Sequence, residues 1–321
     1  IYMQGSYFLS SVADKIILNP QGNLDLHGLS SSRTFYKGLF DKIGVEMQIF
    51  KVGTYKSAVE PYIQDKMSDA NREQVNSYIS DIWKTILTEI SESRQITTDQ
   101  LNNIADTLPT FKAPQWVLEK KLVDTLMYES DVKKYIASLI GVKQASDIKL
   151  ASISDMQSVD FINKNKSDSQ IAVLYAEGSI KSGDGSSDIN DRYYIKQLEK
   201  LKDDDKVKAV VFRINSGGGS AYASEQIWKA VSDLKEKKPI VVSMGDLAAS
   251  GGYYIAANAS MIIAQPSTLT GSIGIFGMFP NVEGLTQKLG MTFDGVKTNK
   301  FSDFGEVTRP MNEEEKAILQ D

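Results

Sequence analysis

An internal repeat constrains the fold of this chain more than any other feature of its sequence. When the sequence is compared with itself at an offset of 246 residues, Gly5 aligns with Gly251 and Tyr7 with Tyr253. The same offset aligns further identical pairs, which include Ala13 with Ala259, Pro20 with Pro266, Gly28 with Gly274 and Gly38 with Gly284. Glycine and proline stand in register where the backbone has special requirements. We infer an ancient duplication and therefore two related domains.

The repeat also predicts the domain boundaries. Residues 1–150 are expected to be the remainder of a first repeat, 151–168 a polar connector, and 169–321 a second repeat. Under this alignment the first repeat lacks the counterpart of about 171–246, and the second repeat is expected to lack its C-terminal tail. We therefore expect the chain to be an internal piece of a larger protein.

Short apolar segments alternate with amphipathic segments in the second repeat. Buried parallel strands are expected at 171–176, 207–214 and 239–243, because these runs are short, apolar and rich in β-branched residues. Helices are expected between them, at about 191–203 and 221–235. Strands that alternate with helices form βαβ units, which predicts a layered α/β domain.

Further elements are predicted outside this alternation. They are a helix after Ser250, a strand at 260–264, a helix at about 281–288 and a strand at 292–296, and in the first repeat a strand at 45–51, a helix capped by Ser68 and a helix capped by Thr97 with Gln100. The predicted fold class is therefore α/β, with two related domains and additional helices.

The composition excludes several kinds of site. The chain has no Cys, which removes disulfide scaffolds, thiolate metal sites and cysteine nucleophiles. The single histidine, His27, cannot form a His-rich metal site, and its alignment with Ile273 favours a packed structural histidine over a base. Acidic residues outnumber basic residues, 41 against 36, which gives nucleic-acid binding little electrostatic basis. We expect no metal, no cofactor and no nucleic-acid partner.

A glycine-rich segment follows the strand predicted at 207–214. Asn215 to Ser220 reads NSGGGS, and its three glycines allow positive φ and a close approach of a ligand to backbone N–H groups. A tight turn between strand and helix explains the same residues, and the glycine spacing does not fit a dinucleotide fingerprint. This segment alone assigns no function.

A candidate nucleophile lies in the segment MGDLAASGGYY, from Met244 to Tyr254. Ser250 is flanked by Ala and Gly, so no bulky side chain crowds its hydroxyl. At the start of a helix, free backbone N–H groups can stabilise an oxyanion. Small residues that let the helix pack tightly against the sheet are the alternative interpretation. The segment from Thr270 to Gly277 adds Ser272 and further flexible backbone.

A serine nucleophile needs a base. Because Cys is absent and His27 is a poor candidate, that base must be a carboxylate or a lysine. Lys56, in VGTYKSAVEPY after the strand predicted at 45–51, is the strongest lysine candidate. Composition alone favours a surface lysine at this position.

Together these segments resemble the protease IV family, the bacterial signal peptide peptidases of the long, duplicated kind. The resemblance rests on GTYKSAVEP, NSGGGS, MGDLAASGGYY and PSTLTGSIGIFG, in this order, and it extends to the duplication. It implies a crotonase-like α/β fold related to the Clp protease proteolytic subunit, and a homotetrameric serine endopeptidase that degrades cleaved signal peptides. It also implies an anchor in the bacterial cytoplasmic (inner) membrane through an N-terminal segment absent here, with the catalytic domain on the periplasmic side.

The resemblance also assigns roles to single residues. It implies Ser250 as nucleophile, Lys56 as base, Ser272 as the residue that orients the lysine, and Gly218 and Gly251 as oxyanion donors. The family commonly has S-P-G-G where this chain has Ser216 followed by three glycines, so the loop is less pre-set and the choice of its donor less certain.

Each repeat has kept one half of this Ser/Lys dyad. Gln4 is the first repeat's counterpart of Ser250, and Ser302 is the second repeat's counterpart of Lys56, so one site must draw on both repeats. To accept a proton near neutral pH, the lysine needs a pKa well below about 10.4. Burial without a carboxylate partner lowers a lysine pKa, so we expect Glu60 to point away from the ammonium.

Two other functions compete with the peptidase. A crotonase-type acyl-CoA enzyme shares the fold and a glycine loop, but it needs a carboxylate over the acyl chain and a nucleotide-binding surface, and the sequence shows neither signature. A degenerate protease that serves as a membrane-associated scaffold needs neither Ser250 nor Lys56, and the chain retains both. For a peptidase, glycine-rich strand edges suit an extended peptide with apolar or small side chains at the cut.

Overall fold

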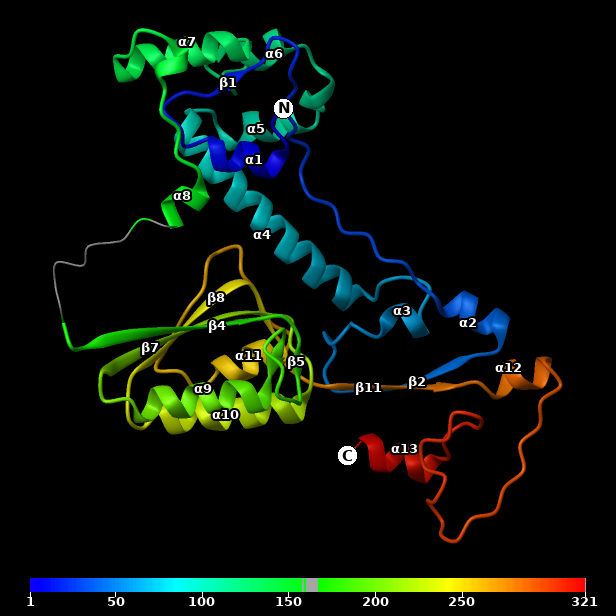
Figure 1. The fold of residues 1–321 in the computed structure, drawn as a ribbon. Helices are drawn as coiled ribbons and strands as arrows, with labels where there is room; N and C mark the ends of the chain where they lie inside the picture. The colour runs from blue at the N-terminus through cyan, green and yellow to red at the C-terminus, as the bar shows by residue number, and fades with distance from the viewer. Residues whose placement is uncertain (158, 160–166, 321) are drawn as a thin grey trace. The chain divides into compact units, whose positions relative to one another are not determined.

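A computed structural model describes residues 1–321 except 158, 160–166 and 321 (Figure 1). The chain forms two compact units: unit 1 comprises Ile1–Ser30 and Ile79–Lys166, and unit 2 comprises Ser31–Tyr78 and Ser167–Asp321. These units do not follow the predicted repeats, because 31–78, assigned to the first repeat, belongs to unit 2. The repeat boundaries at 150 and 169 stay a prediction about sequence ancestry. The predicted connector 151–168 contains helix α8 (Ile153–Gln157), and most of its remainder lies outside the described residues.

The core of unit 2 is a five-stranded parallel sheet. Its strands are β4 (Gln170–Glu177), β7 (Val207–Ser216), β8 (Ile240–Ala249), β9 (Met261–Ile263) and β10 (Leu269–Gly271). The order is β10-β8-β7-β4, and β9 pairs with the first half of β8 while β10 pairs with its last residues. Strand β8 therefore lies inside the sheet, and its carboxyl end is held between β7 and β10.

Two helices cover one face of this sheet, α9 (Asp191–Asp203) and α10 (Ala221–Lys235) (Figure 1). Alternate residues of the central strands, such as Phe212 and Val242, point into the apolar core beneath them, together with Ile227 of α10. The strands predicted at 171–176, 207–214 and 239–243 and both predicted helices are confirmed. Their short apolar runs and amphipathic periodicity identified them correctly.

An antiparallel ribbon in unit 2 joins a strand of the predicted first repeat to a strand of the predicted second repeat. Strand β2 (Glu46–Lys51) pairs with β11 (Phe276–Asn281), so that Lys51 lies opposite Phe276 and Glu46 opposite Asn281. The other elements of unit 2 are α2 (Lys37–Ile43), α3 (Glu60–Ile63), β5 (Ile180–Lys181), β6 (Ile189–Asn190), α11 (Gly251–Ala256), α12 (Glu283–Lys288) and α13 (Glu313–Gln320). The strand predicted at 292–296 is wrong, because this segment forms neither helix nor strand.

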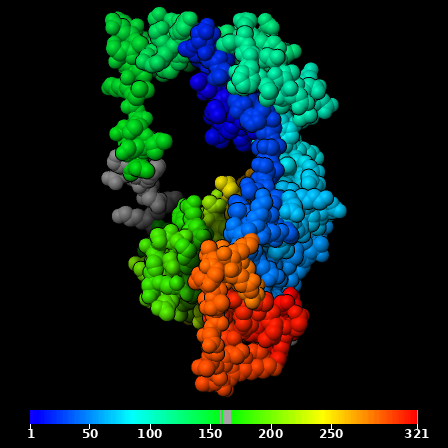
Figure 2. Space-filling model, turned by 90° about the vertical axis from the view of Figure 1, so that its right-hand side faces the viewer, coloured from blue at the N-terminus to red at the C-terminus, as the bar shows by residue number. Residues whose placement is uncertain are grey.

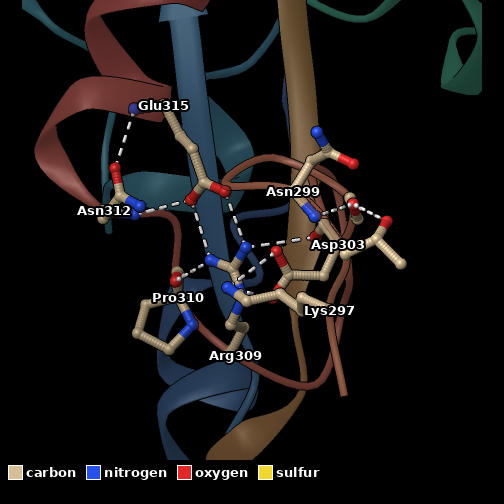
Figure 3. A network of polar contacts seen from close by, with 9 residues as sticks. Lys297, Asn299, Asp303, Arg309, Pro310, Asn312 and Glu315 are labelled. Atoms are coloured by element: carbon tan, nitrogen blue, oxygen red, sulfur yellow. Dashed lines mark hydrogen bonds and ion pairs between the residues drawn. The ribbon is translucent and has the colours of Figure 1, made fainter. Parts of the chain in front are cut away.

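A network of ion pairs joins helix α13 to the irregular segment before it, residues 297–312 (Figure 3). The Arg309 guanidinium binds the carboxylates of Asp303 and Glu315, and Lys297 also pairs with Asp303. The hydrogen bonds from Arg309 lower the pKa of both carboxyl groups to about 2. Figure 2 shows the orange and red C-terminal residues against the blue segment that contains β2, where Met311 N donates to the Gln48 side chain.

Unit 1 is mainly helical. It contains α1 (Gln4–Ser10), most of α4 (Asp69–Arg94), α5 (Thr98–Ala105), α6 (Pro114–Glu119), α7 (Glu129–Ile140) and a two-stranded parallel sheet of β1 (Ile17–Leu18) and β3 (Thr125–Leu126). The predicted caps are confirmed: Ser68 Oγ accepts from Asn71 N at the start of α4, and Thr97 forms a capping box with Gln100. Among the described residues, no helix combines the length and the apolar character that a membrane span requires.

Candidate active site

Ser250 lies where the central strand β8 ends and helix α11 begins. Its backbone has φ 53° and ψ −119°, a conformation that costs a residue with a side chain about 1–3 kcal/mol. The surrounding strand holds it there, because Ser250 N donates to Gly271 O of β10 at 2.8 Å. This turn places the hydroxyl at the carboxyl end of a parallel strand, the edge where open α/β sheets bind their ligands.

The structure brings Lys56, Ser250 and Ser272 together. Lys56 lies in the loop between β2 and α3, and only 6% of it is exposed. Its Nζ is 3.2 Å from Ser250 Oγ, 2.7 Å from the Ser272 carbonyl oxygen and 3.2 Å from Ser272 Oγ. An ammonium or amine at this position can exchange a proton with the serine hydroxyl, since the separation is that of a hydrogen bond.

Burial lowers the pKa of Lys56. Desolvation disfavours the charged ammonium, and among the described residues no carboxylate forms an ion pair with it. Glu60 faces other partners, as expected: its carboxylate accepts hydrogen bonds from Ser68 and Asn71. The neutral amine is therefore more favoured for Lys56 in this site than for a lysine side chain in water.

Ser272 owes its position to an unusual turn after β10. Its φ is 49°, that of the preceding Gly271 is 81°, and that of Gly274, two residues later, is 112°. In this turn the Ser272 carbonyl and hydroxyl oxygens both lie within hydrogen-bond distance of Lys56 Nζ. The two oxygens fix the direction of the lysine side chain relative to Ser250.

The glycine loop packs against the N-terminus of α11. A Cβ atom on Gly218 would lie 2.5 Å from Gly251 N, and one on Gly252 would lie 2.5 Å from Ser216 O, so side chains are excluded on both sides. Gly218 N donates to Ser216 Oγ at 3.1 Å. Within the described part of the chain, the N–H groups of Gly219 and Gly251 have no acceptor. Gly217 N–H of the same loop also has no acceptor among the described residues, so Gly219 is not its sole free donor.

A pocket of about 530 Å³ opens beside these groups in unit 2. It is lined by Lys56, Ser250, Gly219, Gly251 and Ser224, and by apolar and aromatic residues that include Ala221, Tyr253, Tyr254, Ala257, Ile273, Ile275 and Phe276. The apolar wall of this pocket was not predicted, although the run SIGIFG contains three of its members. Gly219 lines this pocket, whereas Gly218 does not.

Gln4, which aligns with Ser250 in the predicted first repeat, binds the backbone of a nearby loop. Its carboxamide oxygen accepts from His27 N at 2.8 Å and Gly28 N at 3.0 Å, and its nitrogen donates to Gly28 O. The prediction of a packed His27 is wrong: the side chain is 51% exposed, and its Nδ1 pairs with Asp25. The loop main chain, not the imidazole, faces Gln4, so alignment with an apolar residue did not imply burial.

Family comparisons match almost the whole chain. Residues 1–143 and 232–321 match the model of peptidase family S49, and residues 162–273 match the Clp protease model. The second match agrees with the parallel sheet and its covering helices, so the predicted Clp-protease-like α/β fold class is confirmed.

Several curated proteins are similar to the chain. Protease 4 of Salmonella typhi is 40% identical over 99% of this chain and 52% of its own length, and Protease 4 of Haemophilus influenzae is 37% identical over 97% and 53%. A putative signal peptide peptidase SppA of Enterococcus faecium is 37% identical over 41% of this chain and 39% of its own length. The chain thus spans about half the length of the two Protease 4 relatives.

Proposed function

The chain belongs to peptidase family S49, and on this premise we propose that it is a serine endopeptidase with Ser250 as nucleophile and Lys56 as general base. The observation that carries the proposal is the 3.2 Å separation between Lys56 Nζ and Ser250 Oγ in a buried site. A buried amine without a carboxylate partner is the form of lysine that can remove a proton from a serine.

The proposed reaction uses one base twice. Neutral Lys56 takes the proton from Ser250 Oγ as the oxygen attacks the peptide carbonyl, and it then gives this proton to the leaving amine as the C–N bond breaks. Water, deprotonated by the same amine, hydrolyses the resulting ester, which releases the acid product and regenerates the Ser250 hydroxyl. Ser272 keeps Nζ directed at the serine through both steps.

The carbonyl oxygen needs donors while it carries negative charge. Gly251 N–H, directly after the nucleophile, is the first proposed donor. Gly218 N–H, the sequence-based choice for the second, would have to leave Ser216 Oγ to take this role. Gly219 N–H has no such competing acceptor among the described residues and belongs to the pocket lining, which favours it as the second donor.

The proposed substrates are signal peptides after their cleavage from exported proteins, at the cytoplasmic membrane of a bacterium with the catalytic domain on the outer side. The apolar wall of the pocket, with Ile273, Ile275 and Phe276, suits the apolar side chains of such peptides. The name of the Enterococcus relative supports the same substrate class. Homotetramer assembly belongs to this proposal as well.

The rate of peptide hydrolysis should rise with pH. The neutral form of Lys56 is the active one, and its pKa is lowered by burial, so kcat/KM should increase as pH rises through that lowered pKa and stay high on the alkaline side. The measurement is kcat/KM for a fluorogenic apolar peptide from about pH 6 to about pH 9. A decline over this range in a folded enzyme, or turnover of acyl-CoA thioesters in place of peptides, would contradict the proposal.

A further inference from the structure

A buried carboxylate fastens the Lys56 loop to the first turn of helix α4. We infer that this residue, Glu60, is a positioning residue that holds Lys56 within reach of Ser250. The inference rests on the proposed function of Lys56 as the base. It assigns a role to a group that the reaction itself does not use.

Glu60 is almost completely buried, with 1% of its surface exposed, and among the described residues it has no cationic partner. Its Oε1 accepts from Ser68 Oγ at 2.5 Å, and its Oε2 accepts from Ser68 N at 3.2 Å and Asn71 Nδ2 at 2.8 Å. All three donors belong to the N-terminus of the 26-residue helix α4, whose dipole favours negative charge there. The carboxylate is therefore held in one place by the helix.

A second contact holds the loop closer to Lys56. Ser57, the residue after Lys56, accepts a 2.6 Å hydrogen bond from Gln74 Nε2, which also donates to Asn71 Oδ1 at 3.1 Å. Asn71 in turn binds Glu60. One connected network thus attaches the chain to α4 one and four residues beyond Lys56, and Tyr55, just before Lys56, makes a separate contact with Glu73 of α4. The loop between β2 and α3 has no regular structure of its own. These contacts therefore fix the distance between Lys56 Nζ and Ser250 Oγ.

The charge of Glu60 does not act directly on Lys56. Burial is the cause of the lowered lysine pKa, without a contribution from a carboxylate. The neighbouring charged and titratable groups have other partners: Glu73 of α4 accepts from Tyr55, and Glu225 of α10 accepts from Tyr254 of α11. Tyr253 of α11 is the remaining titratable group in the pocket lining, and residues 272–276 carry none. What Glu60 controls is the position of the loop, and with it the exclusion of water from the amine.

The second repeat supplies a matched control. Glu306 is the counterpart of Glu60 at the same offset, but it is exposed and accepts only from Thr308 Oγ1 among the described contacts. The counterpart of Lys56 there is Ser302, so Glu306 has no lysine to position. The same substitution at the two glutamates separates positioning from a general loss of negative charge.

The test compares pH profiles of kcat/KM for Glu60→Gln, Ser68→Ala and Glu306→Gln. In Glu60→Gln the amide can no longer accept from all three donors, the loop loosens, and water reaches the amine. We expect kcat/KM near neutral pH to fall by about tenfold, the midpoint of the profile to move to higher pH, and the rate to recover toward that of the parent at alkaline pH. Ser68→Ala should move the midpoint in the same direction by less, and Glu306→Gln should leave it in place.

A folded Glu60→Gln enzyme with an unmoved midpoint would overturn the inference, and so would a midpoint at lower pH, which would mean that the carboxylate charge acts on Lys56 directly. If Glu60→Gln does not fold, the midpoint of Ser68→Ala decides in the same way. Lys56→Ala separates the two claims. An active Lys56→Ala enzyme refutes the proposed base, whereas an inactive one combined with an unmoved Glu60→Gln midpoint refutes only the positioning role.

Discussion

Replacement of Ser250 by Ala, or of Lys56 by Ala, is expected to lower kcat/KM for peptide hydrolysis by at least about a thousandfold. Ser250→Ala removes the attacking oxygen. Lys56→Ala removes the amine that lies 3.2 Å from it, and no other base among the described residues is hydrogen-bonded to Ser250 Oγ. Residues that act as one unit show losses that do not add, so the double variant should be about as slow as either single one.

The control for this prediction is His27→Ala, which should retain substantial turnover because His27 is exposed and paired with Asp25. Circular dichroism and thermal unfolding should show that all variants are folded. Near-parental hydrolysis by folded Ser250→Ala or Lys56→Ala enzyme would refute the dyad.

A lysine transplanted to the second repeat is expected not to restore activity. The variant Lys56→Ala with Ser302→Lys should remain as inactive as Lys56→Ala alone. Ser302 lies in the C-terminal loop, where its Oγ accepts from Asn299 N at 3.1 Å, and it is absent from the lining of the Ser250 pocket. The next residue, Asp303, is held by Arg309, so the loop has little freedom to carry a lysine elsewhere.

The measurement is kcat/KM of the double variant at constant oligomer size. Recovery of activity would show that the second repeat can supply both the serine and the lysine. The claim that the dyad needs one residue from each repeat would then be incorrect. The single variant Ser302→Lys is the control, and it should keep parental activity because Lys56 remains beside Ser250.

Much of the fold was predictable from local patterns, whereas long-range pairings were not. The helices at 191–203 and 221–235 follow from amphipathic periodicity, which needs only neighbouring residues. Strand β11 was not predicted, because its partner β2 lies more than two hundred residues earlier in the chain. A strand was also predicted at 292–296, and it does not form. That segment has no pairing partner among the described strands, and a strand is stable only within a sheet.

The residue types of the candidate site were also predictable, but its geometry was not. The sequence identified Ser250, Lys56 and Ser272 as candidates, and the structure brings the three together. The positive φ of Ser250 depends on the strands around it and leaves no local signal. The hydrogen bond from Gly218 N–H to Ser216 Oγ likewise depends on the backbone conformation of the glycine loop. A repeat marks ancestry, so it could not show that 31–78 packs with the second repeat.

The most direct test of the account is the pKa of the Lys56 amine itself. It can be measured in Ser250→Ala protein by competitive labelling of lysines at a series of pH values, with the modified residues quantified by mass spectrometry. We expect Lys56 to titrate below the ordinary lysine value of about 10.4, because burial disfavours its charged form. A Lys56 amine that titrates at or above that value in the folded protein would contradict its role as the base.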